Sequence, residues 1–367
     1  MVGIDLLTIS IPGVNYPERG YSMRGNSRFE KGVMIILLGM VGFYACQKKE
    51  LKEEARKVLV EALQEKNIYA RLSAAEALAE MGETAKISII REALKNPDGN
   101  VRGAAARAIA RLKDRGSIEE VRELLKDDMP FTRVIAMEVL AELEDKQALP
   151  FLRERIRDKL SPIRKAAVEA IGAMKDKASI RELRTALRDK DPYVHYAAAA
   201  ALAKLGDKSA LQDLRKGLGS EDPGLQIYVI QALGDLKDEV SAPFLEERLE
   251  SPRMDIRVYA AEALLKIDKE KYKEKAFPVL LQTFEIEDPL LRTSVIELMT
   301  QIEDPFFIKP LEERVKEDKY VNVRVAAVKA LVRMRDTSLV DILSKYLKYP
   351  DPFMRIAAAW GIQKLKK

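Results

Sequence analysis

An arginine recurs along this chain at a fixed step. Arg71, Arg102, Arg133 and Arg164 are each 31 residues apart, and the same step then reaches His195 and Gln226. The marker returns as arginine, at intervals of 31, 35, 32 and 31 residues, in Arg257, Arg292, Arg324 and Arg355. Self-similarity at such a period is typical of a fold that stacks one small unit on itself. The sequence therefore predicts ten copies of one unit.

Two apolar columns follow the marker in register. A small residue, usually alanine, lies three residues after it, and Leu, Ile or Met lies seven residues after it. This spacing places both columns on one face of an α-helix. An acid such as Asp145 or Asp176 usually lies twelve residues after the marker, where it would end one helix and cap the next. Each copy is thus predicted to be helix, turn, helix, and no repeat shows the two-residue alternation of a strand.

The repeat resembles a known family. Its pattern, Asp-Pro-x-x-Arg-x-x-Ala-x-x-Ala-Leu-x-x-Leu-x-Asp, is seen in pieces such as 351–358 and 164–176. It resembles short HEAT-like repeats of the phycobilisome-lyase type over about residues 50–367. The resemblance implies an all-α, right-handed α-solenoid of about ten helix pairs, with the second helices on the concave surface. It also implies that the eight marker arginines form a structural ladder with aspartates of neighbouring units. From the repeats we expect one elongated domain.

Composition and charge narrow the function classes. With 47% hydrophobic and 33% charged residues, the chain has the make-up of a folded helical protein and not of a disordered one. The net charge is +5, and residues of opposite sign alternate along the helices. A nucleic-acid binder would need a one-sided basic stripe, so no nucleic-acid partner is expected.

The N-terminal segment differs from the repeats. Arg24, Arg28 and Lys31 precede thirteen mostly apolar residues, 33–45, and the only cysteine of the chain, Cys46, follows at once. Thirteen residues are too few to span a bilayer but suit the apolar part of a secretory signal. The run Phe43-Tyr44-Ala45-Cys46 resembles a bacterial lipobox, which implies that Cys46 carries a diacylglycerol and begins the mature chain. Residues 1–46 are thus predicted to be a leader and signal, and 47–367 the solenoid.

A second interpretation of this segment stays open. Cys46 could be a lone thiol at the end of a short hydrophobic leader that is cleaved in the ordinary way or not at all. The expected location is the bacterial cell envelope, outside the cytoplasmic membrane and held there by the lipid. It becomes the cytoplasm if the leader is an artefact of the assigned start codon.

The sequence offers little for catalysis. One histidine and one cysteine cannot form a Cys/His zinc site or a Cys-His nucleophile pair in the mature chain. The chain also contains no Asp-x-Asp-x-Asp-Gly loop, no glycine-rich phosphate loop and no Gly-x-Ser-x-Gly turn. We therefore expect no catalytic residue, no metal and no cofactor.

Units five to seven carry the candidate binding residues. His195 and Gln226 replace the marker arginine there, and His195 has two interpretations, a weaker turn contact or a functional group. Positions one, two, five and nine after the marker share the helix face opposite to the core. In these units that face includes Tyr196, Tyr228, Tyr259 and Glu262, and Tyr193 lies one turn before Tyr196. The tyrosines form either a patch for a protein or peptide partner or a scatter of surface aromatics.

The chain is accordingly predicted to be a non-catalytic scaffold, anchored in the envelope, that binds protein or peptide partners on its concave face. No small-molecule substrate is expected. The alternatives are an enzyme resembling bilin lyases and a cytoplasmic scaffold of the same fold. Four extra residues between units seven and eight, near 268–275, are expected to form a longer, solvated loop.

Overall fold

The computed structural model describes residues 46–365, and the predicted leader over 1–45 lies outside the described residues. Residues 50–365 belong to one unit, which is all-helical and contains no strand in its described part. Ten helix pairs follow one another along the chain. The prediction of an all-α solenoid built from helix pairs is confirmed.

The second helix of each pair carries the marker. These helices are α2 (Ile68–Glu80), α4 (Gly99–Leu112), α6 (Pro130–Glu142), α8 (Ser161–Ala173), α10 (Pro192–Lys204), α12 (Pro223–Asp235), α14 (Met254–Ile267), α16 (Pro289–Ile302), α18 (Val321–Arg333) and α20 (Pro352–Leu365). Several begin with an aspartate whose side chain caps the helix and a proline at the first helical position. Asp191 accepts from the backbone N–H of Tyr193, and Pro192 follows it. The proline loses no helical hydrogen bond at this position.

The first helix of each pair is shorter in most units. These helices are the one over 46–62, α3 (Ile87–Ala93), α5 (Ile118–Glu123), α7 (Leu149–Arg155), α9 (Ile180–Ala186), α11 (Lys208–Lys216), α13 (Ala242–Arg248), α15 (Lys269–Gln282), α17 (Ile308–Glu317) and α19 (Leu339–Tyr346). In six units, the acid twelve residues after the marker caps the 3-10 or α-helical turn that follows it, as Asp145 does for the N–H of Gln147. The expected loop near 268–275 is wrong, because these residues lengthen α15 by about one turn and bury Tyr272.

The inner helix usually ends in a left-handed turn. Eight of the ten inner helices are followed, eleven residues after the marker, by a residue with positive φ. Gly82 and Gly206 occupy two of these positions at φ of 98° and 94°, and six residues that carry a Cβ occupy the others. The next backbone N–H then reaches back to the carbonyl of the aliphatic column, as Asp145 N does to Leu140 O at 2.9 Å. This turn satisfies a carbonyl that the helix end would otherwise leave unpaired.

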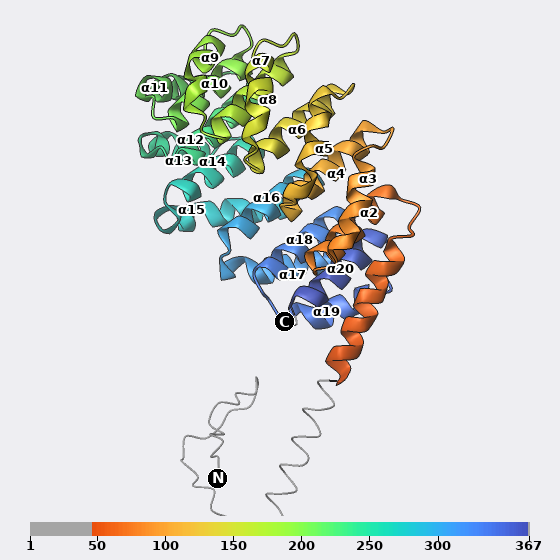
Figure 1. The fold of residues 1–367 in the computed structure, drawn as a ribbon. Coiled ribbons are helices and arrows are strands. Elements are labelled where there is room, and N and C mark those ends of the chain that lie inside the picture. Colours follow the sequence, from red (N-terminus) through yellow and green to blue (C-terminus); the bar gives the residue numbers. More distant parts are fainter. Residues whose placement is uncertain (1–45, 366–367) are drawn as a thin grey trace, which may run out of the picture. The chain divides into compact units, whose positions relative to one another are not determined.

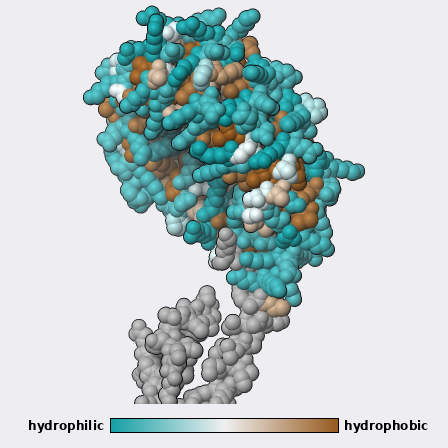
Figure 2. All heavy atoms as spheres, in the orientation of Figure 1, coloured by the Kyte–Doolittle hydropathy of each residue, from teal (hydrophilic) through white to brown (hydrophobic). Residues whose placement is uncertain are grey.

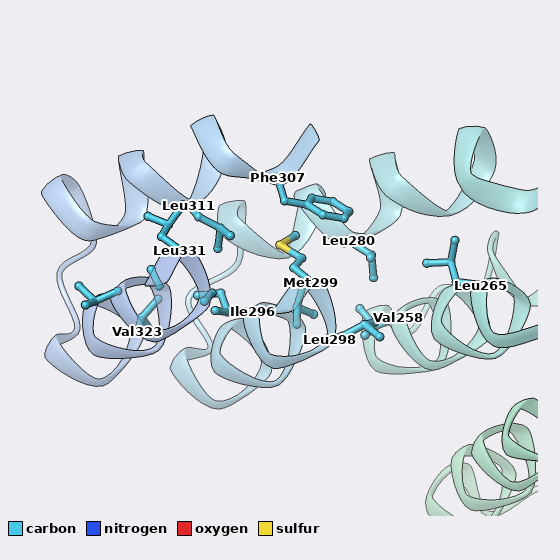
Figure 3. Close-up of a cluster of buried hydrophobic side chains, with 14 of the residues drawn as sticks. Val258, Leu265, Leu280, Ile296, Leu298, Met299, Phe307, Leu311, Val323 and Leu331 are labelled. Carbon is cyan, nitrogen blue, oxygen red and sulfur yellow. The ribbon is translucent and has the colours of Figure 1, made fainter. Parts of the chain in front are cut away.

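The core lies between the two layers of helices. Figure 3 shows Phe307 and Leu311, from the outer layer, directed toward Met299 and Leu331 of the inner helices α16 and α18. All four side chains are fully buried. Each buried side chain of this size contributes about 1.5–3 kcal/mol by leaving water. The alanine and aliphatic columns of the repeat are therefore the residues that hold neighbouring units together.

The ten units close into a ring. Each marker-bearing helix packs against the next one along the chain, and α20 also packs against α2 of the first unit (Figure 1). One buried cluster contains Leu59 and Leu78 of the first unit together with Ala358 and Ile362 of the last. The marker-bearing helices form the inner wall of this ring, and the other helices form its outer layer. The expected elongated shape is wrong, because the rotation from unit to unit brings the two ends of the repeat array together.

Polar residues cover most of the face shown in Figure 2, and hydrophobic residues appear in patches between them. None of the helices between residues 46 and 365 has the length and apolar character needed to cross a bilayer.

Candidate functional site on the inner wall of the ring

The marker arginines link neighbouring units at one edge of the ring. Arg164 donates two hydrogen bonds to Asp189 of the next unit, at 2.7 and 2.8 Å, and one to the carbonyl of Asp158 at 2.9 Å. Arg102 pairs with Asp127 in the same way. The hydrogen bonds from Arg164 lower the pKa of Asp189, although burial opposes them. Such charge-assisted, bidentate pairs are among the stronger polar contacts in proteins.

The other marker arginines vary this arrangement. Arg292 pairs with Asp318, Arg324 donates to the hydroxyl of Tyr349, Arg257 donates to Gln282, and Arg355 pairs with Glu65. Arg71 and Arg133 bond the backbone carbonyls of the loop before their own helix. The eight arginines thus lie in turn and inter-unit contacts.

A second arginine column was missed from the sequence. Arg91, Arg122, Arg153, Arg184 and Arg215 lie on the outer helices and follow the same 31-residue step. Each pairs with the aspartate 23 residues later, as Arg153 does with Asp176 at 2.6 Å. Burial raises the pKa of Asp176, but hydrogen bonds from Ser179 and Arg153 outweigh it and lower that pKa. The signal for this column in the sequence is the 31-residue step that these arginines share with the aspartates, most of which also serve as helix caps.

His195 and Tyr196 lie between the two layers of the ring. The Nδ1 atom of His195 is 2.6 Å from the carbonyl oxygen of Leu187, and its Nε2 atom is 3.0 Å from Asp213 of α11. The ring of Tyr196 packs edge-on against that of His195 and contacts Gly217 at the end of α11. The side chain of Gln226 bonds the carbonyl of Leu218 in the same manner. Both replacements of the marker therefore keep its contact with the preceding loop.

Tyr228, in contrast, lines a hollow on the inner wall. This hollow, named here the tyrosine hollow, has a volume of 330 Å³ and is lined by residues of α8, α10, α12 and α14, among them Glu169, Ala200, Lys204, Tyr228, Asp235 and Lys266. It lies beside a run of five alanines, 197–201, in α10, where Ala200 takes a position that is Glu or Arg in each of the first four units. Units that have Glu or Arg at the position of Ala200 would fill this space.

Charged groups surround the ring of Tyr228. Lys165 lies over its face at 4.7 Å from the ring centre and pairs with Glu169. Burial, together with the carboxylate of Glu169, raises the pKa of Tyr228. On the side of the hollow that α14 forms, Lys266 pairs with Asp235 and Glu262, at 2.8 and 2.7 Å. Burial lowers the pKa of Lys266, but these two carboxylates outweigh it and raise that pKa.

The remaining candidates lie near the hollow. Tyr193 lies at the edge of the ten-unit ring, where its hydroxyl donates to Asp222 at 3.1 Å. The phenol rings of Tyr193 and Tyr228 are in contact, with a centroid distance of 6.4 Å. Tyr259 is half-buried on α14, one turn before Glu262. The structure therefore brings Tyr193 and Tyr228 together, places Tyr259 and Glu262 on the next inner helix, and separates His195 and Tyr196 from the inner wall.

Cys46 is an exposed residue of the helix over 46–62. The lipobox residues before it lie outside the described residues. Among residues 46–365, no group of three or more His, Cys, Asp or Glu side chains is arranged to hold a metal ion.

Several solved structures are similar to this chain at low sequence identity. The complex of CpcE and CpcF of phycocyanin lyase from Nostoc sp. PCC7120 is 22% identical over 61% of this chain and 92% of that chain, with a TM-score of 0.47. Human deoxyhypusine hydroxylase in complex with glycerol is 20% identical over 78% of this chain and 98% of that one, with a TM-score of 0.37. An engineered protein is 20% identical over 86% and 99%, with a TM-score of 0.36. At these identities the likeness concerns the fold alone.

The repeats themselves identify the family. The model of HEAT repeats matches residues 55–141, 87–172, 122–202, 157–225, 180–266 and 308–367. No curated protein sequence matches the chain. Because the matched segments cover well over half of its length, the chain belongs to the HEAT-repeat family.

Proposed function

We propose that this protein is a non-catalytic scaffold that binds a protein or peptide partner in the tyrosine hollow. The observation that carries the proposal is the hollow itself, where the alanines of α10 leave room beside Tyr228 on the inner wall. A tyrosine ring offers apolar area with a polar tip, and residues of this kind dominate the energy of protein interfaces. Glu169, Asp235 and Lys266 around it can orient polar groups of a partner.

Ring closure limits the form of that partner. A partner that reaches the inner wall has to enter the ring, so an extended segment or a loop fits better than a flat protein surface. The hollow offers acids and bases side by side, which favours a peptide with mixed polar side chains over a strongly charged one. The proposed partner is therefore a segment of another protein.

Photo-crosslinking tests the location of the site. A photoreactive residue at Gln231, which lines the hollow, should crosslink one partner from bacterial extract, and the same group at the exposed outer residue Val240 should not. The double variant Tyr228→Ala with Tyr259→Ala should then lower affinity for that partner at least about tenfold. Tyr69→Ala, at an exposed tyrosine of α2, is the matched control and should bind as the wild type does. Equal crosslinking from both positions, or undiminished binding by the double variant, would reject the proposal.

We further propose that the scaffold is anchored in the bacterial envelope through a lipid on Cys46. The support comes from the sequence, in which basic residues and a thirteen-residue apolar run lead to the only cysteine. In Cys46→Ser, the protein should leave the membrane fraction or accumulate as a precursor, and fatty-acid labelling should be lost. Membrane association and labelling equal to those of the wild type would show that Cys46 is not the anchor.

A further inference from the structure

A second hollow lies at the seam, where the first and last units of the repeat array meet. This seam pocket has a volume of 100 Å³ and is formed by α2 of the first unit, α18 and α20 of the last two, and Arg111 of α4. Its volume is several times the roughly 10–15 Å³ that one water molecule needs. No residue of the tyrosine hollow lines it, so the two hollows are separate features of the wall.

One wall of the seam pocket is apolar. Trp360, Phe353, Ile356 and Val325 line it, and Trp360 is the only tryptophan of the chain. The indole N–H of Trp360 donates to Glu80 of α2 at 2.9 Å, and this hydrogen bond across the seam holds the indole side chain in place. Residues at the same repeat position on other inner helices are Glu76, Arg107, Glu138 and Glu169. An aromatic side chain at this position is therefore a local departure from a polar column.

The carboxylates of the pocket already have partners. Arg111 donates two hydrogen bonds to Glu76. Glu80 accepts from Trp360 and pairs with Lys364 at 3.2 Å. Neither acid is left to neutralise another base.

Two basic residues of the pocket lack such partners. Lys329 and Arg333 line it from α18, and neither side chain forms an ion pair or a hydrogen bond with another residue in the described part of the chain. Both side chains are exposed to solvent. Desolvation by the surrounding groups still lowers the pKa of Lys329, and the neighbouring cations Arg111 and Arg333 add to this against the opposing effect of Glu76 and Glu80. The lining residues thus carry three cations and two anions, and an added anion would balance them.

We propose that the seam pocket binds an acidic peptide segment. A carboxylate of the peptide lies between Lys329 and Arg333, and an apolar side chain next to it packs against Trp360. A single anion site beside an apolar wall matches such a segment, whereas a nucleic acid needs many phosphate contacts. Because the pocket spans both ends of the repeat array, the bound peptide also stabilises the closed ring by mass action. The proposal does not depend on the tyrosine hollow.

The emission of Trp360 provides a direct test with purified protein. The probe is the capped tetrapeptide acetyl-Gly-Asp-Leu-Gly-amide, and its uncharged match is acetyl-Gly-Asn-Leu-Gly-amide. The acidic peptide should change the emission saturably at millimolar concentration and raise the melting temperature, and the Asn peptide should bind at least about tenfold more weakly. Sodium acetate at the same concentration separates a peptide site from a site for any free carboxylate, and an equal response to acetate would reject the peptide assignment.

A variant at Lys329 tests whether this unpaired cation binds the peptide. Lys329→Met removes the charge but keeps most of the length of the side chain, so it should preserve the melting temperature and weaken binding of the acidic peptide at least about tenfold. Lys146→Met, on an exposed outer turn, is the matched control and should leave binding unchanged. Equal affinity for the Asp and Asn peptides, no response to either, or wild-type binding by Lys329→Met would overturn the proposal. None of these results bears on the tyrosine hollow, whose test uses a different residue set and partner.

Discussion

The interface between α8 and α10 and the seam between α20 and α2 use the same ladder contact but differ in how closely their helices approach. Arg164 reaches Asp189 across the first, and Arg355 reaches Glu65 across the second. Asp189 and Glu65 each lie six residues before their own unit's marker position. The seam therefore repeats the register of the ring interior, as if the last unit were followed by the first.

The packing beneath these contacts is different. Gly172 of α8 lies directly against Ala201 of α10, so that an added Cβ would be 2.7 Å from the Cβ of Ala201. Gln363 occupies the same repeat position in α20, and its amide donates to the carbonyl of Lys52 across the seam. Direct helix contact holds the interface between α8 and α10, whereas at the seam long polar side chains are added to the buried apolar cluster that the first and last units share. The comparison predicts that the seam should yield before the interface between α8 and α10.

The largest expected effect comes from filling the interior contact. Gly172→Leu should lower the free energy of unfolding by about 3 kcal/mol, because the new side chain meets the backbone of Ala201 and the helices must separate. Gln363→Leu, at the same repeat position in the seam, should cost less than about 1 kcal/mol. Urea denaturation followed by circular dichroism measures both. Equal losses for the two variants would mean that the seam is packed as tightly as the interior.

Double-mutant cycles compare the two ladder contacts. The coupling between Arg164 and Asp189 should be about 2 kcal/mol, because both side chains are nearly buried and share two hydrogen bonds. The coupling between Arg355 and Glu65 should be about 0.5–1 kcal/mol, since a quarter or more of each side chain is exposed. Alanine variants at all four positions provide the two cycles. A seam coupling as large as the interior one would contradict the comparison.

Acid should weaken the interior contact. The folded state lowers the pKa of Asp189 below its unfolded value of about 3.9, chiefly through the hydrogen bonds from Arg164. The folded state therefore binds fewer protons, so this contribution is fully present above about pH 5 and is lost as the pH falls through 3.9 toward the folded pKa. Arg164→Ala should show a shallower fall in stability between pH 5 and 3 than the wild type. Parallel curves of stability against pH for the two proteins would show that this arginine contact does not contribute to the loss of stability in acid.

The smallest effect concerns opening of the seam. As the only tryptophan, Trp360 reports on the seam, and its emission should change at a lower urea concentration than the helical signal does. Glu80→Ala removes its hydrogen-bond partner and should move the emission midpoint further down, with less than about 0.5 kcal/mol of change in the global transition. Coincident midpoints in both proteins would show that the ring unfolds as one unit and that its seam is no weaker than its interior.

The repeat columns predicted the helices but not the ring. Alanine and leucine three and seven residues after the marker place the core correctly because those positions depend only on the geometry of one helix. Closure depends on a small rotation summed over ten units, and no residue within one unit reports that sum. The position of Glu65 six residues before Arg71 was a visible hint, since Asp127 has the same place before Arg133.

The candidate site was predicted in part. Counting helix positions from the marker assigned Ala200, Tyr228 and Asp235 to one face, and all three line the tyrosine hollow. The same count placed Tyr196 there, but position one lies at the border of the inner face, and that ring packs against the end of α11. The seam pocket could not be found from local sequence, because Glu76 and Trp360 are 284 residues apart and only closure brings them together.

The left-handed turns after the inner helices bear on how far this protein could be stabilised. Six of them place a residue with a Cβ at positive φ: Lys113, Glu144, Lys175, Lys237, Glu303 and Arg335. A side chain in this conformation costs roughly 1 kcal/mol relative to glycine, and all six residues are exposed. Gly82 and Gly206 show that the same turn accepts glycine. Replacing these six residues with glycine should therefore raise the thermal stability of the protein, and none of the six lines either hollow.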